Sequence, residues 1–256
     1  MIRVTRDSAV GVVTLNRPES RNALTGQMMR DLFSSLINLD HDEDIRAVVL
    51  TGTDPAFCAG LDLKDLASTY SDMQLSSDVD VPQRGLIPAL HTPIIAAVNG
   101  PAVTGGLEMA LGCDWMIASR QYATFADTHA RVGVMPGAGM TIRLPQLIGI
   151  NRARQMSFTG NFINATTAYE WGLVNEICEH EQLMPRALEM AGAIAGADPL
   201  AVHELRQMYE ELGLRTDGDA YREESRWSRR WMKERFDGGA FSKKRDDIIA
   251  RGSAQQ

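Results

Sequence analysis

Two glycine-bearing loops carry the strongest chemical signal in the sequence. Residues 56–64 read Ala-Phe-Cys-Ala-Gly-Leu-Asp-Leu-Lys, and residues 99–110 read Asn-Gly-Pro-Ala-Val-Thr-Gly-Gly-Leu-Glu-Met-Ala. Each loop follows an apolar run and precedes a helical pattern, and glycine lets the backbone approach a ligand closely. Free N–H groups at a helix start can bind an oxyanion, so the two loops could direct one N–H each at a single oxygen. The alternative is that both are ordinary turns between strand and helix.

Other catalytic signatures are absent from the sequence. It contains no G-x-G-x-x-G, no P-loop and no G-x-S-x-G nucleophile elbow. Residues 180–181 and 203–204 begin like H-E-x-x-H, but neither pair is followed by the second histidine, which excludes that type of zinc site. The Cys-Glu-His run at 178–180 could seed a metal site, but solvated residues at a strand end explain it better, and we expect no metal.

Hydrophobic patterning indicates the elements that position these loops. Residues 2–5 and 10–15 predict two strands of a hairpin, and Thr25 predicts the N-cap of a following helix. Strands and helices that alternate indicate an α/β layer fold with a largely parallel sheet. Continuous apolar runs, typical of buried strands, occur at 47–51, 93–98 and 115–118.

The second half of the chain is mainly helical in pattern. Asn164 predicts the N-cap of a helix over 165–171, which Gly172 ends. Residues 173–177 predict a short strand, and 182–237 read almost entirely as helix. We expect an α/β core over residues 1–200, followed by a helical region over 201–256.

Composition excludes several classes of protein. The chain has 256 residues, 44% hydrophobic and 23% charged, which is ordinary for a globular protein. Its formal net charge of −7 argues against a dedicated nucleic-acid binder, which is normally basic.

Cysteine usage and the absence of targeting signals favour the cytoplasm. Cys58, Cys113 and Cys178 are few, odd in number and widely spaced, which suits a reducing compartment. Residues 1–6 show no apolar segment typical of a signal peptide. The long uncharged stretch over 86–107 contains three prolines, so we interpret it as strand and loop rather than a membrane helix.

Seven short motifs occur in a fixed order along the chain. They are Leu15-Asn-Arg-Pro18 with Asn22-Ala-Leu24, Val48-Val-Leu-Thr-Gly52 with Ala56-Phe-Cys-Ala-Gly60, Ile95-Ala-Ala-Val-Asn-Gly100, Gly105-Gly-Leu-Glu108, Cys113-Asp114, Val134-Met-Pro-Gly-Ala-Gly139 and Gly172-Leu-Val174. In these motifs the sequence resembles the enoyl-CoA hydratase/isomerase (crotonase) family.

The resemblance implies both a fold and an activity. The implied fold is a crotonase-like α/β spiral of ββα units with a helical C-terminal region for trimerisation. The implied activity is that of an enoyl-CoA hydratase of fatty acid metabolism, which adds water across the 2,3 double bond of a 2-enoyl-CoA thioester. Coenzyme A is part of that substrate, and no separate cofactor is implied.

The resemblance also implies binding residues. In the family, two backbone N–H groups hold the thioester oxygen and the enolate that forms from it. By position these belong to Leu61 and Gly105. The basic residues at 243–245 could contact CoA, as the resemblance implies, or could simply be a solvated charge run. The implied acyl-CoA contacts are Ala59, Gly60, Leu61, Asp62, Leu63, Lys64, Gly105, Phe241 and Lys244.

The catalytic pair departs from the family pattern. Family hydratases use two glutamates, and Glu108 matches the first, in the first turn of the helix that follows the second loop. His129 stands where the second is expected, and histidine can act as an acid or base near neutral pH. It could instead be a pocket wall. Asp127 is a weaker substitute, because in a strand it would point away from the site.

Other functions within the family stay open for this reason. One is an enoyl-CoA isomerase, although the missing second acid argues against it. Another is a β-diketone hydrolase, which resembles this chain in having a histidine but pairs it with an acid where this chain has Ala138. A third is a non-catalytic acyl-CoA binding protein.

The late helical region suggests self-association. Trp227, Trp231, Met232 and Phe236 give it more apolar surface than one helix needs. We therefore expect a homotrimer or a dimer of trimers, acting on an acyl-CoA and binding neither nucleic acid nor a membrane.

Overall fold

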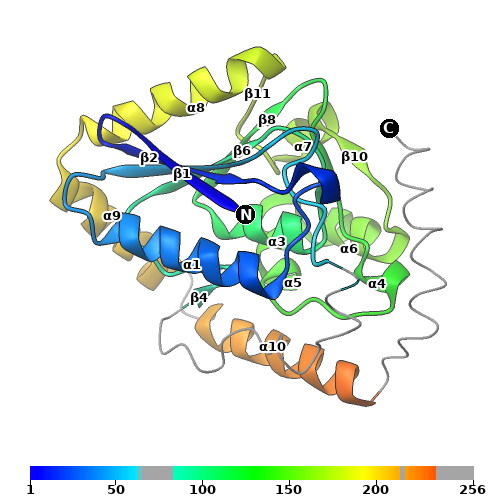
Figure 1. Ribbon diagram of the computed structural model, residues 1–256. Helices are drawn as coiled ribbons and strands as arrows, with labels where there is room; N and C mark the ends of the chain where they lie inside the picture. Colours follow the sequence, from blue (N-terminus) through cyan, green and yellow to red (C-terminus); the bar gives the residue numbers. More distant parts are fainter. Residues whose placement is uncertain (63, 65–82, 214–216, 235–256) are drawn as a thin grey trace.

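A six-stranded sheet forms the centre of the protein, as a computed structural model of the chain shows (Figure 1). The structure describes residues 1–62, 64, 83–213 and 217–234. The strands are β1 (Ile2–Asp7), β2 (Val10–Leu15), β3 (Ala47–Gly52), β4 (Gln83–Arg84), β5 (Ile87–Pro88), β6 (Ile94–Val98), β7 (Ala102–Val103), β8 (Trp115–Ser119), β9 (Thr124–Ala126), β10 (Ile163–Asn164) and β11 (Glu176–Cys178).

The large sheet is almost entirely parallel. Its order is β1-β2-β3-β6-β8-β11, and only the β1–β2 pair is antiparallel. The helices are α1 (Gly26–Asp40), α3 (Gly105–Gly112), α4 (His129–Val132), α5 (Met140–Ile148), α6 (Ile150–Thr159), α7 (Ala165–Trp171), α8 (His180–Ala195), α9 (Pro199–Gly213) and α10 (Asp217–Glu234).

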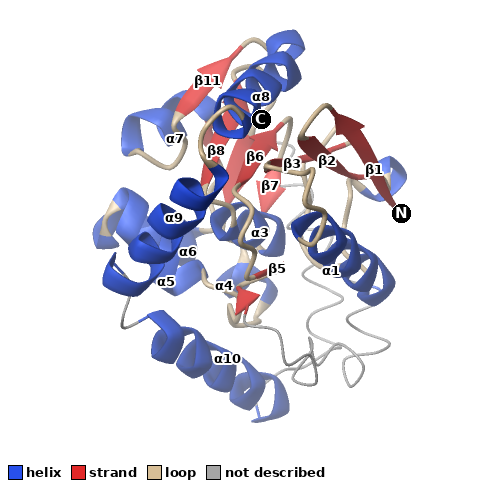
Figure 2. Ribbon diagram, turned by 90° about the vertical axis from the view of Figure 1, so that its left-hand side faces the viewer, coloured by secondary structure: helices blue, strands red, loops and turns tan. Residues whose placement is uncertain are grey.

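Apolar residues on both faces of this sheet are buried, which explains why its strands read as continuous apolar runs. Alternate residues of β3 point to opposite faces: Val48 and Leu50 join the core beneath α1 and α3, whereas Val49 joins the core beneath α8. From α8, Leu183 and Ala187 complete this second core. Figures 1 and 2 show α8 on one side of the sheet and α1 and α3 on the other.

Most predicted elements are confirmed. Thr25 caps α1 by accepting a hydrogen bond from the Met28 N–H, and Asn164 caps α7 in the same way. Gly172 ends α7 in the left-handed conformation, with φ of 83°. The predicted strand over 173–177 was placed too early, because β11 begins only at Glu176. The α/β class and the largely parallel sheet are therefore confirmed, with a shift at one strand.

A second, three-stranded sheet brings the two halves of the candidate site together. Its order is β10-β9-β7, and β7 and β9 run parallel with Val103 opposite Ala126. Because both strands end at this register, the segments that follow them meet at one edge. One segment leads into α3, and the other leads into α4. Among the described residues, no helix has the length and apolar character needed to cross a membrane.

Candidate active site

The two glycine loops lie against each other, as the oxyanion hypothesis requires. A side-chain carbon built on Gly105 would lie only 3.5 Å from the Leu61 nitrogen, and one on Gly60 would lie 3.5 Å from the Gly105 nitrogen. Within the described part of the chain, neither the Leu61 N–H nor the Gly105 N–H donates a hydrogen bond. The loops therefore present two neighbouring N–H donors, the minimum that an oxyanion needs.

Close backbone packing determines where these donors lie. Residue 106 must be glycine, because a side-chain carbon there would lie 2.1 Å from the Cys58 carbonyl oxygen. Thr104 has φ of 52°, a conformation that threonine rarely adopts. Its hydroxyl contacts the Thr128 hydroxyl at 2.6 Å, and its N–H donates to the Ala126 carbonyl. The strained residue before Gly105 is therefore held by the segment that carries His129.

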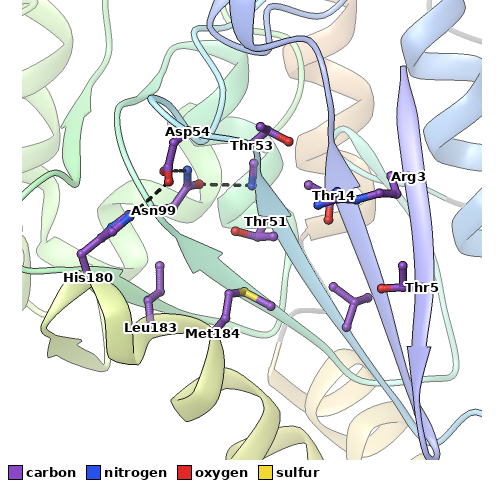
Figure 3. A pocket seen from close by; sticks show the side chains of 12 residues that line it. Arg3, Thr5, Thr14, Thr51, Thr53, Asp54, Asn99, His180, Leu183 and Met184 are labelled. Atoms are coloured by element: carbon purple, nitrogen blue, oxygen red, sulfur yellow. Dashed lines mark hydrogen bonds and ion pairs between the residues drawn. The ribbon is translucent and has the colours of Figure 1, made fainter.

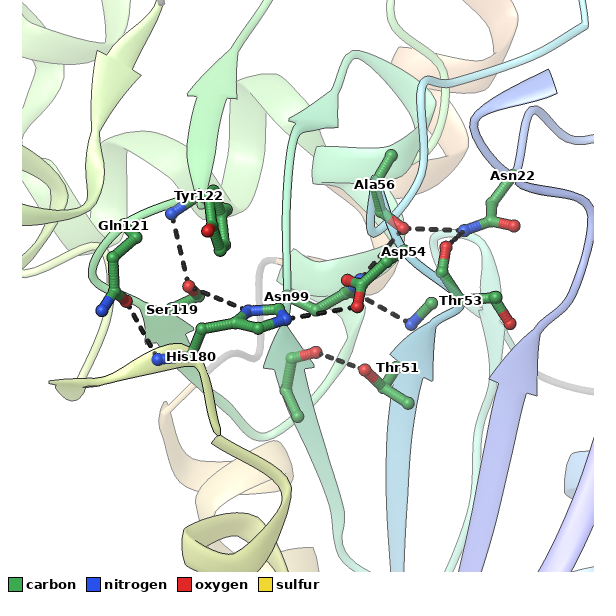
Figure 4. Close-up of polar contacts among 12 residues, drawn as sticks. Asn22, Thr51, Thr53, Asp54, Ala56, Asn99, Ser119, Gln121, Tyr122 and His180 are labelled. Atoms are coloured by element: carbon green, nitrogen blue, oxygen red, sulfur yellow. Dashed lines mark hydrogen bonds and ion pairs between the residues drawn. The ribbon is translucent and has the colours of Figure 1, made fainter. Parts of the chain in front are cut away.

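Asparagine side chains fasten the first loop to the large sheet (Figure 4). The Asn99 amide donates to Asp54 and to the Ala56 carbonyl, while its oxygen accepts the Gly52 N–H. The Asn22 amide donates to the same Ala56 carbonyl at 2.7 Å. These contacts hold the start of the segment that leads to Leu61.

Glu108 is buried on α3, one turn after Gly105. Its side chain is only 5% exposed. One carboxylate oxygen, Oε1, accepts the N–H groups of Ala138 and Met140 at 3.0 and 3.4 Å. Residues three apart on a helix share a face, so Glu108 lies on the same side of α3 as the Gly105 donor.

His129 lies between two carboxylates. Its Nε2 is 3.8 Å from Oε2 of Glu108, and its Nδ1 is 2.6 Å from Oδ1 of Asp127. The prediction that Asp127 points away from the site is wrong. Residues two apart in a strand lie on the same face, so even a continuing strand would have directed Asp127 and His129 to one side. In the structure β9 ends at Ala126, and the chain then turns so that the Asp127 carboxylate contacts the imidazole two residues later.

The charge of Asp127 is stabilised by its neighbours. Burial raises the pKa of the Asp127 carboxyl, but hydrogen bonds from His129, the positive charge of protonated His129 and a hydrogen bond from Ser157 outweigh burial. The pKa of Asp127 therefore lies below its usual range, and the residue is ionised at neutral pH. The contact between Asp127 and His129 was missed at the sequence level, where only an Asp-x-His spacing hinted at it.

The predicted acyl-CoA contacts fall into three groups. Ala59 and Gly60 form the bend before Leu61, where Gly60 has φ of 94°. Asp62 is paired with Arg17, whose guanidinium donates to it at 2.5 Å, while Lys64 is exposed. Leu63, Phe241 and Lys244 lie outside the described residues, as do the side chains of Trp227 and Trp231.

A separate cleft lies on the face of the sheet that α8 covers (Figure 3). Its volume is about 380 Å³, and none of Leu61, Gly105, Glu108 or His129 lines it. At its rim His180 contacts Asp54 at 3.2 Å and Ser119 at 3.2 Å. His180 is thus engaged in a hydrogen-bonded chain, and among the described residues no group of three or more His, Cys, Asp or Glu could hold a metal.

Comparisons with known proteins identify the family to which the chain belongs. A family model described as enoyl-CoA hydratase/isomerase matches residues 5–233. The chain is 35% identical over 217 residues to enoyl-CoA hydratase EchA19 of Mycobacterium tuberculosis, covering 82% of this chain and 80% of the relative. It is 34% identical over 217 residues to a crotonyl-CoA hydratase of Syntrophomonas wolfei, covering 84% and 82%.

A solved structure is similar over nearly the whole chain. The crystal structure of an enoyl-CoA hydratase from Mycobacterium tuberculosis aligns with a TM-score of 0.81 and 42% identity, covering 91% of this chain and 97% of that one. The fold is therefore that of the crotonases. Sequence, fold and loop geometry together show that the chain belongs to the enoyl-CoA hydratase/isomerase family.

Proposed function

We propose that the protein is an enoyl-CoA hydratase, which adds water across the 2,3 double bond of a 2-enoyl-CoA thioester. The observation that carries the proposal is the facing pair of Glu108 and His129, with 3.8 Å between Oε2 and Nε2. Hydrogen bonds to water are about 2.8 Å long, so one water can contact both atoms. Such a water has a base and an acid on either side of it.

The backbone donors activate the acceptor. When the thioester oxygen accepts the N–H groups of Leu61 and Gly105, electron density is drawn from C3, which water can then attack. The same two donors stabilise the enolate oxygen that forms. Both belong to packed loops and need no rearrangement during the reaction, and one such donor contributes about 3–4 kcal/mol in comparable sites.

The two side chains then share the proton transfers. Ionised Glu108 takes a proton from the water as the water oxygen bonds to C3. Protonated His129 gives a proton to C2, so that the enolate becomes the saturated 3-hydroxyacyl thioester. The backbone N–H groups of Ala138 and Met140 hold one carboxylate oxygen of Glu108, Oε1, while Oε2 faces His129.

Hydration is favoured over the alternatives. Proteins similar over four fifths of the chain are named enoyl-CoA hydratase and crotonyl-CoA hydratase. A double-bond isomerase needs no water-activating pair, and a protein that only binds acyl-CoA needs neither Glu108 nor His129.

We also propose that the protein self-associates and acts in the cytoplasm. On α9, Leu200, Leu205 and Tyr209 are 75%, 55% and 77% exposed. Exposed apolar residues that gather on one element are typical of contact surfaces, which supports a homotrimer or a dimer of trimers. The three free cysteines support a reducing compartment.

Product analysis tests the proposed reaction. Purified protein is incubated with a panel of 2-enoyl-CoA thioesters, and loss of the conjugated-thioester absorbance is followed with mass spectrometry of the product. Hydration adds the mass of one water and keeps the thioester. A product of unchanged mass would indicate isomerisation, a free acid would indicate hydrolysis, and tight binding without turnover would indicate a binding protein. Any of these three results in place of hydration would overturn the proposal.

A further inference from the structure

Asp127 is in close contact with His129. The Asp127 side chain is 1% exposed, and its Oδ1 lies 2.6 Å from the imidazole Nδ1. The same oxygen accepts the backbone N–H of His129 at 3.2 Å. Two contacts from one oxygen to one residue determine both the position of the ring and the direction of its far nitrogen.

Among the residues that the structure describes, Asp127 and Glu108 face His129 from different elements. Asp127 approaches Nδ1 from the turn between β9 and α4, and Glu108 approaches Nε2 from α3. The other charged residue of α4, Arg131, is directed to α6, where its Nε donates to the Thr159 carbonyl. The imidazole therefore lies in a row of carboxylate, imidazole and carboxylate.

This row determines where protons reside. Ionised Asp127 accepts the proton on Nδ1, so any neutral His129 carries its proton there and turns a lone pair toward Glu108. Two nearby negative charges favour the imidazolium, whose second proton then lies on Nε2, toward the reacting water.

We infer that Asp127 is a positioning residue, which holds His129 in the orientation and charge state needed to protonate C2. The inference rests on the proposed hydratase function, in which His129 is the acid. It explains how a histidine can stand where the resemblance leads one to expect a glutamate. A second carboxylate supplies the negative charge that the histidine lacks and keeps the imidazole protonated while Glu108 is ionised.

A measurement of His129 itself tests the inference without any turnover. In protein labelled with ¹⁵N-histidine, long-range ¹H–¹⁵N correlations show which ring nitrogen carries a proton. The chain has five histidines, and the signal lost in His129→Gln identifies the one of interest. We expect Nδ1 to stay protonated in the wild type over the whole pH range. A neutral His129 protonated on Nε2 would overturn the inference.

Asp127→Asn tests the consequence for catalysis. The asparagine keeps the size but loses the charge and can donate to Nδ1, so the wrong tautomer becomes available. We expect kcat to fall about 10–100-fold, the usual scale for a supporting partner, with KM changed less than about threefold. We also expect the high-pH limb of kcat/KM to move down by about one pH unit or more.

Asp40→Asn is the matched control. Asp40 also accepts the backbone N–H of a histidine, His91, and contacts its Nδ1 at 3.2 Å, but the His91 side chain is 65% exposed. We expect this control to leave the pH profile unchanged. An Asp127→Asn variant that lowers kcat while leaving both the pH profile and the His129 signals as in the wild type would overturn the positioning role. Absence of hydration by the wild type would instead count against the proposed function, and the NMR result would still stand.

Discussion

Replacing His129 with glutamate would create the two-glutamate pair that the family resemblance implies, but next to a third carboxylate. The new carboxylate would occupy the place of the imidazole, whose Nδ1 lies 2.6 Å from Oδ1 of Asp127. The two negative charges would then lie about 4 Å apart. At an effective dielectric constant of 20, two like charges at this distance repel by about 4 kcal/mol. We therefore expect His129→Glu to lower the unfolding free energy by up to about 4 kcal/mol at neutral pH, until one carboxyl takes up a proton.

The unfolding free energies of the wild type and of His129→Glu should depend on pH in opposite directions. In the wild type the pKa of Asp127 is lowered on folding, so its contribution is present above the unfolded pKa and is lost as pH falls through the folded pKa. In His129→Glu the crowded carboxyls bind protons more tightly in the folded state. Stability should then increase as pH is lowered from about 8 to about 5. Urea unfolding of His129→Glu and of the wild type across this pH range measures the change in unfolding free energy.

A second substitution isolates the cause. In Asp127→Asn/His129→Glu the third charge is gone, so we expect stability to recover and hydration activity to exceed that of His129→Glu alone. The two sites touch, so their effects should be strongly non-additive. If His129→Glu alone matched the wild type in stability and activity at every pH, Asp127 would not be the ionised partner and the electrostatic reasoning would fail.

Three further predictions follow from the loops and the surface. Gly106→Ala should lower Tm by several degrees or prevent folding, because its side chain meets the Cys58 carbonyl at 2.1 Å, whereas Gly192→Ala, with nothing within 4 Å, should not lower Tm. Gly105→Pro removes one oxyanion donor and should reduce kcat about 10²–10³-fold in a folded protein, while acyl-CoA affinity falls much less; retained turnover would mean that the donor is another residue. Analytical ultracentrifugation at micromolar concentration should show a trimer or hexamer, and a stable monomer would refute the proposed assembly.

The hydrophobic pattern of the sequence predicted the fold well because apolar residues pack on both faces of the large sheet. Strands β3 and β6 are buried on both faces, so they appear in the sequence as uninterrupted apolar runs. The strand over 173–177 was placed too early because Leu173 and Val174 are buried without being in a strand. Burial and strand geometry give the same apolar signal at that point, and only the backbone after α7 separates them.

The site was predictable only in part, for a different reason. The two loops and Glu108 belong to contiguous motifs, so short-range pattern was enough to find them. The role of Asp127 depends on β9 ending at Ala126 rather than one residue later, and such boundaries follow from tertiary packing. A strand that continued by three residues, through His129, would have placed Asp127 and His129 on the same face but apart.

The most direct test of the account is the rate of crotonyl-CoA hydration by Glu108→Gln. Glutamine keeps the shape of Glu108 and can still accept the N–H groups of Ala138 and Met140, but it cannot accept a proton from water. The matched control is Glu204→Gln, on the exposed surface of α9. We expect a loss of about 10²–10⁴-fold in kcat for Glu108→Gln and no loss for the control. A Glu108→Gln enzyme that is folded and hydrates crotonyl-CoA at the wild-type rate would contradict it.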